Sequence, residues 1–184
     1  MTPPKRVRFI ALLSGVVGVI VVALIVLLAT RDSNQATTFQ SPLLGRPAPV
    51  MAGVTLQGPV INLANAKGHV IVVNFFASWC PPCQQESPQL SAFAYDQTKI
   101  TNGAQMLGVV YNDSTAAMKA FIQQQGIGYP VLTDPQGNTA NRWGVSSPPT
   151  TYIVAASGRV VAAYVGPLTA KQLDAAVKPY VGVH

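Results

Sequence analysis

The pattern of apolar and polar positions predicts a mixed α/β domain. Residues 70–76 (VIVVNFF) are apolar on both parities at all but one position, which is typical of a strand covered on both faces. Apolar runs at 105–111, 150–155 and 160–165 predict three further strands, of which the last two form a hairpin. A short strand is expected at 131–132.

Helices are predicted in three intervals around these strands. The first covers 81–99 and contains Pro88, which should kink it. The second follows Ser114, a good N-cap, and ends at Gly126, and the third covers 170–180. This order implies parallel strands with right-handed crossovers, followed by an antiparallel hairpin. The fold class is therefore α/β, a mixed sheet with helices on both faces.

The start of the chain is a long apolar segment. Residues 9–29 carry no charge, and at about 1.5 Å per residue a helix of this length spans a bilayer core of about 30 Å. Three basic residues lie within 1–8, so the positive-inside bias places 1–8 in the cytoplasm and the rest outside. A cleaved signal peptide is the alternative, but its apolar region is normally about 7–15 residues with an A-x-A-like site after it. An uncleaved anchor is favoured.

Between the anchor and the first central strand, the composition predicts a tether and a hairpin. Residues 30–44 are rich in polar side chains and are expected to form a tether, so that the domain occupies 45–184. Residues 50–63 alternate weakly around a Gly-Pro turn, which predicts a β-hairpin added to the N-terminal side of the domain.

The net charge of +6 says little about partners. Four basic residues flank the apolar segment, and the others are scattered singly without aromatic interleaving. Nucleic acid is therefore not an expected partner. No cofactor is expected either.

The only two cysteines, Cys80 and Cys83, stand where the central strand gives way to the first helix. A loop this short stabilises a fold little as a staple. A zinc site needs about four ligands, and the histidines, His69 and His184, lack the spacing. Covalent haem attachment needs a histidine after the second cysteine, where Gln84 stands. Thiol–disulfide chemistry remains.

Position predicts the role of each sulfur. Cys80 at the helix N-terminus should be the exposed attacking thiolate, and Cys83 should resolve the mixed disulfide. Pro81 and Pro82 suit the first helical turn but remove two N–H donors from the thiolate. We therefore expect a moderately lowered Cys80 pKa and a reducing couple.

These residues resemble a known family. The segment 79–83 (WCPPC) after VVNFFAS is similar to the thioredoxin superfamily. Glu86, Pro88, the Pro-Ala-Pro at 47–49 and the N-terminal apolar segment resemble its membrane-tethered TlpA/ResA/CcmG (DsbE) branch, and 144–152 resembles the segment with that family's cis-proline. The resemblance extends over roughly 45–179 and implies a thioredoxin-like fold.

Carried onto this chain, the resemblance makes Cys80 the nucleophile and Cys83 the resolving thiol. It makes Glu86 the acid that ResA-like members keep near the cysteines to tune proton transfer. A partly buried carboxylate beside thiols has a clear way to shift pKa values. The alternative is that Glu86 only complements the helix dipole.

The resemblance also assigns residues to substrate binding: Trp79, Pro148, Pro149 and Thr150. Pro149 matches the cis-proline, although local chemistry does not distinguish it from Pro148. Trp79 is either a lid beside the sulfurs or an ordinary core aromatic.

Three positions depart from the family pattern. Asn74 stands where thioredoxins carry a buried acid, which leaves Glu86 as the substitute. Gln84 replaces a common basic residue. Pro148 lacks the N–H that usually pairs with an extended substrate, so binding would depend on its carbonyl and on side chains.

The leading hypothesis is a membrane-anchored, extracytoplasmic thiol–disulfide oxidoreductase acting as a reductase. The resemblance implies apocytochrome c or a maturation chaperone as substrate, and a DsbD/CcdA-type membrane protein as electron donor. An oxidant or isomerase of secreted proteins is the alternative in the same class. A thioredoxin-fold metallochaperone or assembly factor is the alternative of another class.

Overall fold

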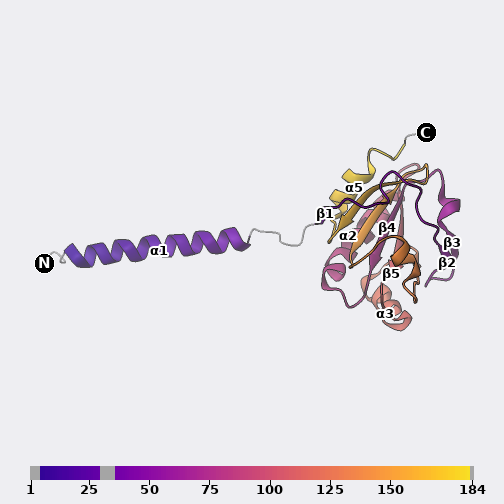
Figure 1. Ribbon diagram of the computed structural model, residues 1–184. Coiled ribbons are helices and arrows are strands. Elements are labelled where there is room, and N and C mark those ends of the chain that lie inside the picture. Colours follow the sequence, from indigo (N-terminus) through magenta and orange to yellow (C-terminus); the bar gives the residue numbers. More distant parts are fainter. Residues whose placement is uncertain (1–4, 30–35, 183–184) are drawn as a thin grey trace. The chain divides into compact units, whose positions relative to one another are not determined.

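The computed structural model covers residues 5–29 and 36–182, with side chains described for 15–27 in the first range. The chain divides into two units, Met1–Ser33 and Asn34–His184 (Figure 1). Helix α1 (Lys5–Ala29) belongs to the first unit. Across the ranges just given, no helix is both long enough and apolar enough to cross a membrane. The anchor at 9–29 stays a prediction, and residues 1–4 and 30–35 of the expected cytoplasmic and tether segments lie outside the described residues.

The second unit is built on a mixed sheet. In spatial order its strands are β1 (Thr37–Thr38), β8 (Val160–Val165), β7 (Thr150–Val154), β4 (Ile71–Phe76), β5 (Gln105–Val110) and β6 (Val131–Leu132). Strand β4 is parallel to β5, which is parallel to β6, whereas β7 is antiparallel to both β4 and β8. The predicted parallel half and closing hairpin are confirmed.

The predicted N-terminal hairpin is also present. Strands β2 (Ala52–Val54) and β3 (Val60–Asn62) form a separate antiparallel pair at the periphery of the unit (Figure 1). Its turn is bound to the edge strand β6, because the Leu56 N–H donates to the Val131 carbonyl at 2.8 Å. The Gln57 side chain extends this contact with bonds to the Tyr129 carbonyl and the Val131 N–H. The hairpin therefore covers an edge that would otherwise be open.

Two apolar cores cover the two faces of the sheet. The helices are α2 (Pro81–Gln97), α3 (Thr115–Gln125), α4 (Asn138–Arg142) and α5 (Ala170–Val177), with a 3₁₀ turn η1 (Leu63–Ala66). Helices α2, α3 and α5 contribute to one core, together with the even-numbered residues of β4 such as Val72 and Phe76. The odd-numbered residues such as Phe75 face the other core, which contains Trp143 and Tyr152. All six residues of β4 are buried, as its two-sided apolar pattern predicts.

The structure differs from the sequence prediction in three places. Residues expected in the tether are part of the domain, since β1 pairs with β8 and the Phe39 N–H donates to the Ala163 carbonyl at 3.1 Å. Strand β1 forms by backbone pairing with β8, which is distant in the sequence, so no apolar pattern in residues 37–38 predicts it. Helix α4 and the turn η1 were not predicted, because both are short. Pro88 lies inside α2, as predicted, and the kink at this residue stays a prediction.

Candidate active site

The two cysteines form a disulfide at the start of α2. Cys80 is the N-cap, its Cα lies 5.2 Å from that of Cys83, and its Sγ accepts the Cys83 N–H at 3.3 Å. Pro81 and Pro82 occupy the first helical turn, as expected. The pair therefore lies just beyond the carboxyl end of β4, where a buried strand fixes its position.

The prediction that Cys80 is exposed is wrong for this disulfide form. Cys80 is 3% exposed and Cys83 is 2% exposed, and both belong to the core cluster of α2. The Cys80 sulfur is bonded to that of Cys83, which lies in the same core. The neighbouring Trp79 is 54% exposed, so it is a surface side chain and not a core aromatic.

The loop after β5 is hydrogen-bonded to the loop that carries the cysteines (residues 77–80, the redox loop). The Trp79 indole N–H donates to the Asn112 carbonyl at 3.0 Å, and the Ser78 N–H donates to the Asp113 carboxylate at 2.7 Å. The Tyr111 hydroxyl reaches the Ser146 carbonyl at 3.0 Å. The loop between β5 and α3 thus connects the cysteine loop with the loop that precedes β7.

Sequence reasoning missed this second loop. The signal available to it was an Asn-Asp-Ser segment directly after the strand that is parallel to β4. The carboxyl ends of parallel strands meet at one sheet edge, so polar residues there are neighbours of the cysteines.

Pro149 is the cis-proline, because the peptide bond between Pro148 and Pro149 is cis. Thr150 pairs with Phe75 across the antiparallel β7 and β4, which places Pro149 at the sheet edge that also carries the cysteine loop. The Pro149 carbonyl accepts the Gly166 N–H at 3.0 Å. The Pro148 ring is partly exposed and has no N–H to offer a substrate.

Thr150 has a different place from the one expected for a substrate contact. It is 2% exposed, and its hydroxyl donates to the Ser147 carbonyl at 2.6 Å. The hydroxyl therefore braces the loop before β7.

Glu86 is buried beneath the cysteines. It is 1% exposed and lies three residues after Cys83, on the same side of α2. Its carboxylate accepts the Leu168 N–H at 3.0 Å and the Asn74 side-chain amide at 3.3 Å. Burial raises the pKa of Glu86 to about 8, although these two hydrogen bonds lower it. Asn74, at the position where the resemblance expects a buried acid, is thus a hydrogen-bond partner of Glu86.

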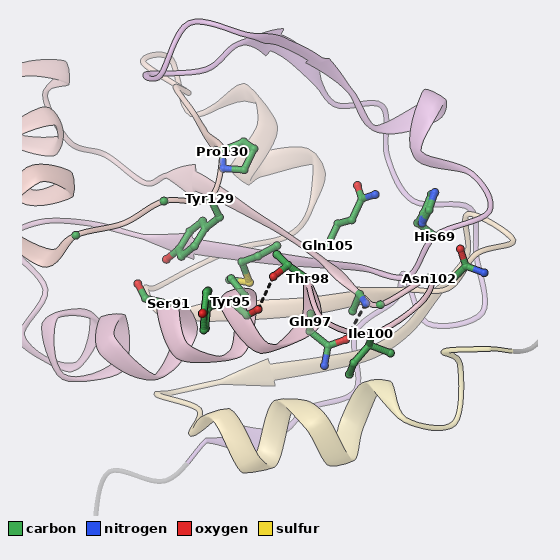
Figure 2. Close-up of a pocket in the computed structure, with 16 residues that line it drawn as sticks. His69, Ser91, Tyr95, Gln97, Thr98, Ile100, Asn102, Gln105, Tyr129 and Pro130 are labelled. Atoms are coloured by element: carbon green, nitrogen blue, oxygen red, sulfur yellow. Dashed lines mark hydrogen bonds between the residues drawn. The ribbon is translucent and has the colours of Figure 1, made fainter.

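A cavity of about 710 Å³ opens at the far end of α2 (Figure 2). Its lining includes Gln97 and Thr98 at the end of the helix, Gln105 at the start of β5, and Tyr129. Gln97, Thr98 and Gln105 lie at the end opposite to the cysteines. In the described part of the chain, no group of three or more His, Cys, Asp or Glu residues is arranged to hold a metal ion.

Comparisons with known proteins agree with this geometry. Residues 44–163 match the AhpC/TSA family. The thiol:disulfide interchange protein DsbE homolog of Paracoccus denitrificans is 35% identical over 169 residues, which are 90% of this chain and 86% of that protein. The thiol-disulfide oxidoreductase ResA of Bacillus thuringiensis is 30% identical over 135 residues, which are 73% of this chain and 77% of that protein.

Solved structures show the same fold. A thiol:disulfide interchange protein of the thioredoxin family from Chlorobium tepidum superposes with a TM-score of 0.68 at 30% identity, covering 78% of this chain and 100% of that chain. The resemblance to the thioredoxin superfamily and its DsbE and ResA members is confirmed. The chain belongs to the AhpC/TSA family of thioredoxin-fold proteins and is a thiol–disulfide oxidoreductase of the DsbE and ResA type.

Proposed function

We propose that the protein is a membrane-anchored, extracytoplasmic reductase of protein disulfides. The supporting observation is the sparse set of donors at Cys80. The first turn of α2 supplies one N–H to its sulfur, that of Cys83 at 3.3 Å, since Pro81 and Pro82 have none. A thiolate with few donors is only moderately stabilised, which makes the dithiol the less favoured state and a better reductant.

The reaction follows from the two sulfurs. The Cys80 thiolate attacks a substrate disulfide, forms a mixed disulfide and releases the first substrate thiolate. Cys83 then loses its proton and attacks the Cys80 sulfur, which releases the second substrate thiolate. Two electrons pass to the substrate, and the protein ends in the disulfide form seen here.

Glu86, in its ionised form, supports the second step as the proton acceptor. Its pKa of about 8 lies close to that of an ordinary thiol, about 8.5, so a proton can pass between them at little cost in free energy. It is buried beside the cysteines, where bulk water has little access.

The proposed substrates are the C-x-x-C-H cysteines of apocytochrome c or a maturation chaperone that carries them. A DsbD/CcdA-type membrane protein would return the electrons. Both partners rest on the resemblance to the DsbE and ResA branch. The anchor is proposed on the charge-free segment 9–29, and the apolar side chains described in α1, such as Val19 and Ile20, are exposed. The basic residues before it favour a cytoplasmic N-terminus.

The reduction potential of the full chain tests the proposal. In detergent, the chain is equilibrated against defined thiol buffers, and the Cys80 pKa is measured on the same sample. A potential near or below about −270 mV, as in thioredoxin, supports a reductase. A potential near about −120 mV, as in a strong disulfide donor, would make the protein an oxidant.

The substrate is tested by trapping. The Cys83→Ser variant should accumulate a mixed disulfide through Cys80 with an oxidised C-x-x-C-H peptide, because the resolving thiol is gone. The matched Cys80→Ser variant should accumulate none. Equal trapping by both variants would contradict the assigned roles.

A further inference from the structure

Unpaired polar atoms gather on the inner side of α2. Within the described residues, six buried side-chain N or O atoms have no hydrogen-bond partner, and four of them belong to Asn74, Ser87, Ser91 and Tyr129. Two of the four lie on α2 in the turns directly after Glu86. Buried polar groups are normally paired with protein or with ordered water, so these four atoms are open to bonds with water.

The sheet brings Tyr129 next to the Glu86 carboxylate. Asn74, which bonds to Glu86, is paired with Gly108 across β4 and β5. A Cβ on Gly108 would lie 3.3 Å from the Tyr129 ring, so the ring lies over this glycine, beside Asn74. Burial raises the pKa of the Tyr129 hydroxyl and the charge of Glu86 raises it further, which agrees with this placement.

Tyr129 connects this buried cluster with the cavity at the far end of α2. The residue is 6% exposed, yet it lines the cavity, as does Ser91. Figure 2 shows the hydroxyls of Tyr129 and Ser91 directed toward one another. Neither has a hydrogen-bond partner in the protein, and a cavity of about 710 Å³ beside two unpaired hydroxyls has room for bridging water.

We propose that Tyr129 and Ser91 relay protons between Glu86 and solvent in this cavity. The proton that Cys83 gives to the Glu86 carboxylate passes through water and the two hydroxyls. Each hydroxyl accepts one proton and donates another, so the relay itself carries no net charge and is neither oxidised nor reduced. When the protein is reduced again, the proton travels in the opposite direction.

A proton route that opens away from the cysteines matters because a bound protein substrate covers the cysteine loop. The disulfide lies at the cysteine end of α2, whereas the cavity is lined by the end of α2 and the start of β5. A protein seated on the cysteine loop excludes water from the sulfurs but leaves the cavity open.

The groups around Glu86 come from three segments of the domain and from α2. The groups facing Glu86 are Asn74 of β4, the Leu168 N–H before α5, and Tyr129 before β6. On α2 and its N-cap, the preceding thiols are Cys83 and Cys80, which titrate only when the disulfide is reduced. The acidic residue of α5, Asp174, is bonded to Gln97 at the other end of α2.

The test compares Tyr129→Phe and Ser91→Ala with Tyr95→Phe as matched control. Tyr95 lines the same cavity but is 65% exposed. The reduced full chain in detergent is oxidised by insulin, a protein disulfide, in a single turnover. Acid quenching and alkylation follow the decay of the mixed disulfide between pH 6 and pH 9, in H₂O and D₂O, with and without imidazole.

The relay predicts a slower resolving step with a proton-transfer signature. Tyr129→Phe should slow the decay of the mixed disulfide roughly tenfold, raise the solvent isotope effect, and be partly rescued by imidazole. Ser91→Ala should act in the same direction, and the double variant should be less than additive. The reduction potential and the Tyr95→Phe rate should stay at wild-type values.

The inference rests on the proposed role of Glu86, so Glu86→Gln is measured alongside. If Glu86→Gln is slow while Tyr129→Phe decays at the wild-type rate, the relay is wrong and the role of Glu86 stands. If Glu86→Gln is also as fast as wild type, the role of Glu86 fails. A slow Tyr129→Phe without isotope effect or imidazole rescue shows a packing role and overturns the relay.

Discussion

Glu86→Gln should stabilise the oxidised protein at alkaline pH and leave its stability nearly unchanged near pH 4.5. The carboxyl is 1% exposed and has two hydrogen bonds, from the Leu168 N–H and the Asn74 amide. Burial raises its pKa from 4.5 to about 8, because the ionised form loses more hydration than these donors replace. Glutamine keeps the size of the side chain and removes the charge.

The stability of the wild-type protein should fall as the pH rises from 4.5 to about 8. Over this range the folded state keeps a proton on Glu86 that the unfolded state has released, so the folded state holds more protons. Below 4.5 both states are protonated and the penalty is absent; above about 8 it is fully present. One pKa unit corresponds to about 1.4 kcal/mol, so the full penalty is on the order of 5 kcal/mol.

Guanidinium denaturation of the oxidised full chain in detergent measures this difference. The free energy of unfolding is compared for wild type and Glu86→Gln at pH 4.5 and pH 9. The variant should gain several kcal/mol over wild type only at pH 9. An equal difference at both pH values, or none at pH 9, would refute the assignment of a buried, neutral carboxyl.

Two further substitutions test the packing of the site. Asp113→Ala should cost about 2 kcal/mol of stability, because its carboxylate accepts two backbone N–H groups, that of Ser78 among them. Asp96→Ala, which removes an exposed ion pair, is the matched control and should cost less than about 1 kcal/mol. Gly108→Ala should cost about 1–3 kcal/mol, since its Cβ would lie 2.7 Å from the Phe76 ring. Denaturant unfolding of the oxidised protein measures all three.

Each of these predictions has an outcome that would contradict it. A loss in Asp96→Ala as large as that in Asp113→Ala would indicate a general effect of charge and not the contact with the redox loop. Wild-type stability in Gly108→Ala would mean that the two rings over the glycine can move aside, and that their close packing on the sheet is not required.

Much of the redox site is local and could be read from the chain. The apolar run before Cys80 predicts a buried strand, and the prolines after it predict the first turn of a helix. The spacing of Glu86 from Cys83 places both on one side of that helix. The full burial of Glu86 could not be predicted from the sequence. Its partners Asn74 and Leu168 come from a strand and from a segment 82 residues away.

The contacts that hold the site together depend on distant segments. Asp113 bonds the backbone of Ser78 across 35 residues, and no local pattern predicts which N–H an acid will reach. Tyr129 reads in the sequence as an isolated aromatic residue before a short strand. Its place beside Glu86 exists only because Gly108 leaves room for its ring on the sheet.

The sequence by itself therefore determined the order of strands and helices, the redox pair and the helix side that carries Glu86. These features depend on side-chain periodicity and on neighbours within one or two turns. The tertiary structure decided that Cys80 is buried in the disulfide form and that residues 36–44 join the domain. It also decided that burial raises the pKa of Glu86 to about 8. Burial and hydrogen bonding depend on which distant segments pack together, and that is settled only when the sheet is assembled.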